Sequence, residues 1–251
     1  MARLFDDASS ESLDLNAAVI SAPPLTMACW FYSDDDASAQ TLMSLGNNGS
    51  DGFIRMALGG GDPGDPLIVQ ARGDAGGTTH RADTTTGYSV NTWHHALATM
   101  DGNGSQITSS SIYIDNGSSA SDSTVITQPS PNFTNVGVLQ RSSKVQYLSG
   151  RAEWAAWWDV ILDADERAAL AAGVIPWKIR PASLVSCVPI WGLHDPEIDF
   201  INERTWTLAG TPTRANGAPV LPFSDAGGTV PLIETAAPAA RTPALSLLGV
   251  G

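Results

Sequence analysis

Short segments with a two-residue hydrophobic period fill most of the chain. In LTMACWFYS (25–33), Met27, Cys29 and Phe31 share one side of an extended strand, and the residues between them share the other. Glycine-rich runs such as GGGDPGD and NNGSDG separate these segments and supply the positive φ angles that tight turns need. The pattern predicts an all-β fold, a two-sheet antiparallel jelly-roll sandwich. Strands are expected over 2–5, 25–33, 41–46, 52–58, 66–72, 78–82, 92–100, 110–115, 133–139, 147–160 and 204–212, with a further strand within 176–193.

One segment breaks the strand pattern and predicts a single short helix. In LDADERAALAAG, Asp163 is suited to cap the first turn, and Glu166 follows three residues later, as in a capping box. Gly173 supplies the left-handed residue that commonly ends a helix. We expect this helix to act as a clasp at one edge or end of the sandwich.

The composition changes near residue 220. Residues 1–220 are expected to form one jelly-roll domain, and residues 221–251 an extended arm rich in Ala and Pro. The arm has too few bulky apolar residues to fold alone, so we expect it to attach to other proteins or to sister subunits. Its expected anchors are Val230, Leu232, Ile233, Leu245, Leu247 and Leu248.

The charge balance excludes some classes of partner. The chain has 13 basic and 26 acidic residues, a net charge of −13, and its Lys and Arg residues form no run. Nucleic-acid binding and attachment to an anionic membrane are therefore not expected. The first ten residues contain no apolar stretch typical of a secretory signal, which favours synthesis in a cytoplasm.

Two cysteines, Cys29 and Cys187, both lie in apolar strand patterns. A disulfide between them and a pair of free thiols both fit the sequence. The apolar surroundings favour buried thiols, because an unpaired cysteine packs like a small hydrophobic residue.

Several motifs occur in a characteristic order along the first 212 residues: LTMACWFY, WHHALATMDGNG, SSIYIDNG, SGRAEWAAWWDVILDADERAALAAG and SLVSCVPIWGL. In this order they resemble the laminin-G-like, concanavalin A-like jelly-roll family. The resemblance implies two facing antiparallel sheets of about six or seven strands each. In TWHHALATM, alternation places His95 and Leu97 on one face of a strand and His94 and Ala96 on the other, so the two histidines are not expected to bind a metal together.

The segment HDPEIDFINE (194–203) tests whether the chain is a glycosidase. Glu197, Asp199 and Glu203 would share one face of an extended strand. Retaining glycosidases need two carboxyl groups about 5–5.5 Å apart, whereas Glu197 and Glu203 would lie about 20 Å apart if extended. We therefore interpret the segment as a solvated loop and expect no enzymatic activity.

Two other groups of residues are candidates for binding. Trp154, Trp157 and Trp158 are candidates for contact with a carbohydrate or a partner if one side of their strand is exposed, although core packing suits tryptophan better. Laminin-G-like domains often hold Ca²⁺ at the rim of the sandwich. Calcium is thus the one cofactor considered, with Asp6, Asp7 and Asp51 as candidate ligands.

Two functions fit these observations. The first is a virion structural protein of a tailed bacteriophage, located in the particle and displaying a lectin-like jelly roll toward host glycans, because compact proteins of this kind resemble those found among phage structural genes. The arm would join it to other virion proteins or into a homo-oligomer. The alternative is a carbohydrate-binding module or adhesin that is not part of a virion.

Overall fold

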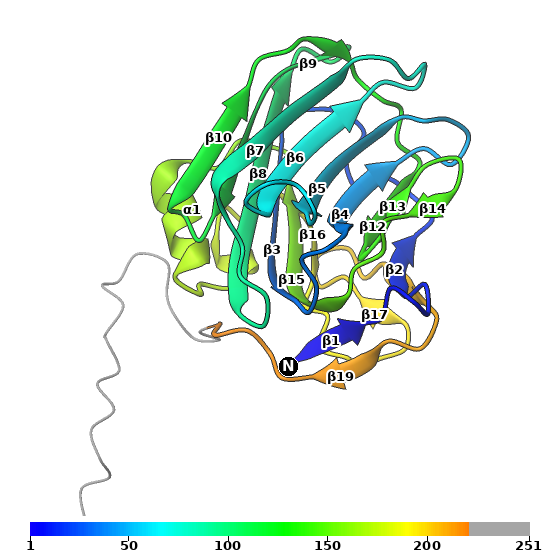
Figure 1. Ribbon diagram of the computed structural model, residues 1–251, viewed down its shortest axis with the longest axis vertical. Helices are drawn as coiled ribbons and strands as arrows, with labels where there is room; N and C mark the ends of the chain where they lie inside the picture. The colour runs from blue at the N-terminus through cyan, green and yellow to red at the C-terminus, as the bar shows by residue number, and fades with distance from the viewer. Residues whose placement is uncertain (221–251) are drawn as a thin grey trace, which may run out of the picture.

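The computed structural model describes residues 1–220, which form two large antiparallel sheets packed face to face (Figure 1). The nine-stranded sheet has the order β10-β9-β8-β3-β15-β1-β19, with β11 added beside β9 and β16 beside β15. The eight-stranded sheet has the order β17-β18-β2-β12-β4-β5-β6-β7, and β13 and β14 form a separate hairpin. The predicted all-β sandwich with one short helix is confirmed, with more strands per sheet than the resemblance implied.

The strands of the nine-stranded sheet are β1 (Ala2–Phe5), β3 (Leu25–Ser33), β8 (Trp93–Gly102), β9 (Gln106–Ile114), β10 (Ser118–Asp122), β11 (Ile126–Thr127), β15 (Gly150–Trp158), β16 (Leu184–Val188) and β19 (Thr213–Ala215). Those of the eight-stranded sheet are β2 (Ser12–Leu15), β4 (Ala39–Gly46), β5 (Phe53–Gly59), β6 (Pro66–Arg72), β7 (Thr79–Gly87), β12 (Phe133–Val136), β17 (Glu197–Ile198) and β18 (Thr205–Ala209). The hairpin consists of β13 (Leu139–Gln140) and β14 (Lys144–Val145). The helices are α1 (Ala164–Ala171) and the 3-10 turn η1 (Pro176–Lys178).

The main core lies between the two sheets. Trp157 from β15 stacks on Trp206 from β18, with ring centroids 5.4 Å apart, and thereby joins the two sheets. Both tryptophans are fully buried. The predicted alternation along β8 is also confirmed, because Ala96 and Ala98 face this core while Leu97 faces a second cluster on the outer side of the sheet.

The second cluster explains the position of the helix. Leu162 and Leu170 pack with Trp158 on the outer face of the nine-stranded sheet, so α1 covers a sheet face rather than an edge of the sandwich. The capping box is confirmed, since the Asp163 carboxylate accepts from the Glu166 amide at 3.0 Å and Glu166 accepts from the Asp163 amide at 2.8 Å. Gly173 follows the last turn with φ 93°.

The predicted strands differ from the observed ones where short elements or a special backbone residue intervene. The expected strand 133–139 is two strands, because Gly137 with φ 80° interrupts it. Strand β2 was not expected, since SLDL is short and follows a polar run. The arm, residues 221–251, lies outside the described residues, so the anchors expected there remain predictions.

Candidate functional site

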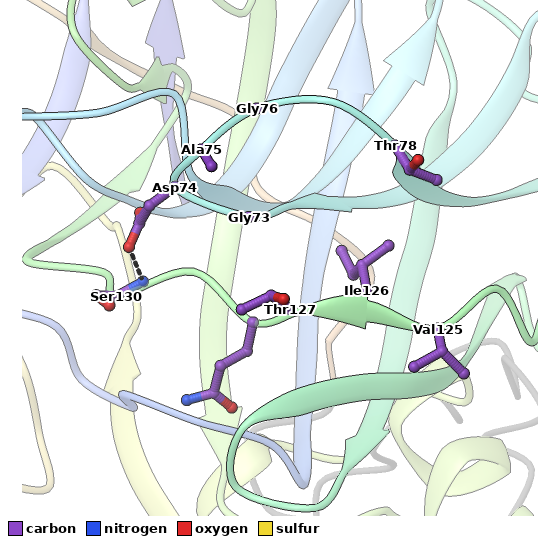
Figure 2. Close-up of a pocket in the computed structure, with 10 residues that line it drawn as sticks. Gly73, Asp74, Ala75, Gly76, Thr78, Val125, Ile126, Thr127 and Ser130 are labelled. Atoms are coloured by element: carbon purple, nitrogen blue, oxygen red, sulfur yellow. Dashed lines mark hydrogen bonds between the residues drawn. The ribbon is translucent and has the colours of Figure 1, made fainter.

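A pocket of about 510 Å³ opens at one end of the sandwich. One wall is the loop between β6 and β7, and the other is the segment from Val125 to Ser130 that contains β11 (Figure 2). Pairing of β11 with β9 holds the second segment in place, with Ile126 opposite Ile107. The lining residues are Gly73, Asp74, Ala75, Gly76, Thr78, Val125, Ile126, Thr127, Gln128 and Ser130.

Asp74 connects the walls of this pocket to a third loop. Its Oδ1 accepts from Ser50 Oγ at 2.7 Å and from Asn47 Nδ2 at 3.1 Å, and its Oδ2 accepts from the Ser130 amide at 3.0 Å. Burial alone would raise the pKa of the Asp74 carboxyl, but the hydrogen bonds from Ser50, Ser130 and Asn47 outweigh burial and hold the pKa below its ordinary value. Asp74 is therefore an ionised acceptor at neutral pH.

The pocket suits binding better than catalysis. A carboxylate offers about four lone-pair sites, so Oδ2 of Asp74 can accept one more hydrogen bond. Thr78, Thr127 and Ser130 add exposed hydroxyl groups, and Val125, which is 54% exposed, adds an apolar surface. Asp74 is the only titratable side chain among the lining residues, whereas glycoside hydrolysis requires a pair.

The sequence did not point to this pocket. Its first wall contains the glycine-rich run GDAGG (73–77), which by its sequence predicts only a turn, and Gly76 and Gly77 do make that turn with φ 74° and 83°. A side chain at Gly73 would place its Cβ 2.8 Å from the carbonyl oxygen of Thr127, so glycine permits the two walls to approach closely. Only the fold brings residues 73–78 beside residues 125–130.

The three tryptophans considered for ligand contact are all buried. Trp157 is in the core between the sheets, and Trp154 and Trp158, on the outer face, are 4% and 0% exposed. Core packing, which the sequence favoured for these tryptophans, therefore holds for all three, and the ligand contact considered for them is wrong, because α1, η1 and the segments after β16 cover the outer face.

Trp154 instead supports an aromatic cluster, formed by Trp154, Trp177, Trp191 and Phe200. Trp154 contacts Trp177 and Trp191 edge-on, with ring centroids 5.0 and 5.1 Å away. Phe200 stacks on Trp177 at 5.6 Å and is 46% exposed. Trp177 and Trp191 are partly exposed, so the most exposed ring of this cluster is Phe200, which belongs to the segment 194–203.

That segment is only in part the solvated loop expected from the sequence, because Glu203 is exposed but Glu197 and Asp199 are not. Glu197 is buried and pairs with Arg3, with Nε 2.7 Å from Oε1. Asp199 is fully buried and accepts from Ser186 Oγ and from the amides of Cys187 and Ile201 at 2.8–3.0 Å. Both carboxylates accept structural hydrogen bonds, so the expectation of a solvated side chain is wrong for Glu197 and Asp199.

The candidate calcium ligands do not form a group. Asp6 and Asp7 lie in the turn after β1, where Asp6 accepts from Ser9 Oγ at 2.6 Å, whereas Asp51 lies between β4 and β5 and faces Arg72. Within residues 1–220, no three His, Cys, Asp or Glu side chains are arranged to hold a metal ion. The proposed grouping of these three aspartates is therefore wrong, and calcium binding as such stays a prediction.

The histidines and cysteines have packing roles. His95 is buried and meets Trp30 edge-on at 5.3 Å, while His94 Nδ1 lies 2.7 Å from the Asp115 carboxylate, so the two rings do not form a joint metal site. Cys29 and Cys187 are free and buried, as favoured from the sequence, and burial raises the pKa of both thiols. No helix within the described range is long and apolar enough to cross a bilayer.

Solved structures of the same fold come from several sources. A candidate carbohydrate-binding protein from Bacteroides ovatus aligns with TM-score 0.57 and 16% identity over 86% of this chain and 61% of its own. The sialidase domain CBM40 from Ruminococcus gnavus, bound to α2,3-sialyllactose, aligns with TM-score 0.50 and 14% identity over 59% and 82%. Domain 4 of an extracellular arabinanase from Geobacillus stearothermophilus, in complex with arabinotriose, aligns with TM-score 0.52 and 14% identity over 64% and 72%.

At these identities the structural similarity establishes the fold alone. No curated protein sequence shows significant similarity to this chain. A family model does match, over residues 7–166, which is more than half of the sequence. Together with the two-sheet sandwich, this match shows that the chain belongs to the concanavalin A-like lectin/glucanases superfamily, in its laminin-G-like branch.

Proposed function

We propose that this protein is a non-enzymatic glycan-binding module that uses the pocket beside Asp74. The observation that carries the proposal is the position of one ionised, firmly held carboxylate in an open pocket of about 510 Å³ on a lectin-like sandwich. Such a carboxylate accepts hydrogen bonds from sugar hydroxyl groups without moving. Holding it in place beforehand lowers the entropy lost on binding.

The lining supports a division of roles. Oδ2 of Asp74 accepts from a sugar hydroxyl, and the hydroxyls of Thr78 and Thr127 donate to or accept from neighbouring sugar oxygens. Val125 packs against the C–H face of the ring, which is the apolar side of a pyranose. The carbohydrate ligands seen with the two sugar-bound relatives are consistent with this use of the fold.

The finer part of the proposal concerns where the module works. We place it on a tailed bacteriophage particle, as a decoration, head-fibre or tail-associated protein whose jelly roll contacts host glycans. The support is the sequence alone: a compact laminin-G-like domain followed by an Ala/Pro-rich arm with apolar anchors. In this proposal the arm joins the domain to other virion proteins or to sister subunits. An adhesin outside a virion is the alternative.

A glycan array tests the binding proposal. Wild-type protein should bind a defined subset of glycans, and Asp74→Asn should lose about tenfold or more in affinity for them, because a charged acceptor is replaced by a neutral amide. Asp159→Asn, which removes one exposed carboxylate at the end of β15, is the matched control and should bind normally. Equal binding by the two variants, or no binding to any glycan, would contradict the proposal.

A further inference from the structure

Four arginines lie close together on the outer face of the eight-stranded sheet, away from the core. Arg55 on β5 is opposite Gln70 on β6, and Gln70 is opposite Arg81 on β7. Arg72 follows Gln70 by two residues on β6. Val69 and Ala71 face the core, so Gln70 and Arg72 both face outward. Arg141 comes from the turn of the β13–β14 hairpin. We call Arg55, Arg72, Arg81 and Arg141 the arginine patch.

Arg55 is buried, yet neutral groups alone satisfy it. Its Nε and Nη2 donate to Oε1 of Gln70 at 3.0 and 2.7 Å, and its Nη1 donates to Oε1 of Gln146 and to Thr41 Oγ1. Among residues 1–220, no carboxylate lies within ion-pair distance of Arg55. The backbone of Gln146 has φ 55°, a left-handed conformation that glutamine rarely adopts. The fold thus holds a desolvated positive charge without its counterion.

The other three members of the patch differ in how their charge is balanced. Arg81 pairs with Asp62 and Asp83 at 2.7 Å, and Arg72 has Asp51 at 3.4 Å. Arg141 has no ion pair within the described residues. Burial and then repulsion by Arg81, Arg141 and Arg72 lower the pKa of Arg55 to about 10, so its guanidinium remains charged at neutral pH.

The ring of Phe53 lies on the same outer face of β5 as Arg55, because Ile54 between them faces the core. The guanidinium carbons of Arg55 and Arg72 lie 5.5 and 5.3 Å from its centroid, so one guanidinium from the same strand, β5, and one from the neighbouring strand, β6, lie against the same ring. Phe53 is 3% exposed, so it positions the arginines and is not itself a stacking surface for a ligand. This arrangement fixes two planar forks at a set spacing.

The patch is connected to the pocket of the proposed function through a single loop. Ser50 donates to Asp74 in the pocket, and its carbonyl accepts from the Ser142 amide beside Arg141 at 3.0 Å. Arg72 donates to the carbonyl of Asp51 at 3.1 Å in the same loop, and Gly73, next to Arg72, already lines the pocket. A ligand that extends from the pocket over residues 47–52 would reach the arginines.

We propose that the arginine patch binds the carboxylate of an acidic sugar, with Arg141 as the contacting fork and Arg55 and Arg72, whose Nη2 is buried, as fixed positive charges beside it. This inference rests on the proposed glycan-binding function and assigns its ligand class. Guanidinium groups match a planar carboxylate through paired hydrogen bonds. A carboxylate supplies the negative charge that Arg55 lacks, whereas a neutral sugar leaves that charge unbalanced. The protein as a whole has a net charge of −13, so the attraction for an anionic sugar comes from the arginine patch and not from the overall charge.

Sodium glucuronate is the first probe, with glucose and sodium chloride at matched concentration and ionic strength as controls. Glucuronate should shift the ¹⁵N-correlated Nε–Hε signals of the patch arginines, and glucose and chloride should not. Arg141→Gln removes the half-exposed guanidinium in a hairpin turn and should weaken glucuronate binding about tenfold, and an unchanged melting temperature checks that the variant is folded. Arg214→Gln on β19 of the other sheet removes the same charge and should leave binding unchanged.

The outcomes separate this inference from the proposed function. Shifts with glucuronate no larger than with chloride, or normal glucuronate binding by Arg141→Gln, would overturn the inference. If glucose 6-sulfate bound more tightly than glucuronate, the assignment to a carboxylate would be wrong. Binding of neutral glycans that depends on Asp74 but not on Arg141 would leave the proposed function intact and remove only the ligand class.

Discussion

At the scale of single residues, burial decides what each polar side chain does. The sequence raises Glu197 and Asp199 as possible catalytic acids, but both side chains are buried and accept structural hydrogen bonds. Asp74, which the sequence placed in an ordinary turn, keeps a free lone pair at an open pocket. All three side chains are carboxylates. Whether each has a structural or a binding role depends on how far the surrounding residues bury it and occupy its hydrogen-bonding positions.

Asp199 gives a direct test of this distinction. Asp199→Ala removes three acceptor contacts and leaves the Ser186 hydroxyl and the amides of Cys187 and Ile201 without a buried partner. The free energy of unfolding should fall by about 3 kcal/mol, measured by urea denaturation. The exposed Glu203, changed to Ala, is the control and should alter stability by less than about 0.5 kcal/mol. Similar losses from both variants would show that Asp199 is not the structural carboxylate.

His95 predicts a specific pH dependence of stability. Burial lowers the pKa of His95 from 6.5 to about 4, although the nearby Asp115 opposes the shift. The unfolded chain therefore takes up this proton first, and stability that is fully present above about pH 6.5 is lost as the pH falls toward 4. His95→Phe, which preserves the packing on Trp30, should flatten the stability profile in this window by up to about 3 kcal/mol. An unchanged profile would contradict the assignment.

At the scale of elements, the parts that local chemistry determines were predictable and the parts that depend on long-range pairing were not. Strand β3, the two faces of β8 and the cap at Asp163 follow from alternation and capping chemistry. The cover over Trp154 does not, because it requires η1 and Phe200 to fold back over β15. The pocket does not either, since β11 has two residues and its position depends on pairing with β9.

The helix cap can be tested on its own. Asp163 also lies 3.3 Å from Arg180 Nη2, and Arg180 pairs with Glu166 at 2.6 Å, so the cap ties α1 to the turn after η1. Asp163→Ala should lower the free energy of unfolding by about 1 kcal/mol, because the first turn loses its side-chain acceptor. Asp163→Asn or Ser, which retain a capping oxygen, should recover most of this loss. An unchanged melting temperature in the Ala variant would show that the cap contributes nothing.

At the scale of the whole molecule, residues 1–220 contain both sheets and their core, and the arm belongs to assembly in our proposal. A protein lacking residues 222–251 should therefore melt as the full chain does, since the stacked Trp157 and Trp206 and the surrounding core are retained. It should not join the particle or the oligomer formed by the full chain, as measured by native mass spectrometry and particle incorporation. Normal assembly of the truncated protein would end the proposed role of the arm.

The central claim is that a glycan occupies the pocket beside Asp74, and filling that pocket tests it most directly. Val125 is 54% exposed on one wall, so Val125→Trp adds bulk inside the pocket without disturbing the core or the hydrogen bonds of Asp74. Calorimetric titration with the best glycan from the array should show wild-type binding and a loss of at least about tenfold in Val125→Trp, with unchanged melting temperature. Equal affinity of the two proteins for that glycan would place the binding site elsewhere and contradict the account.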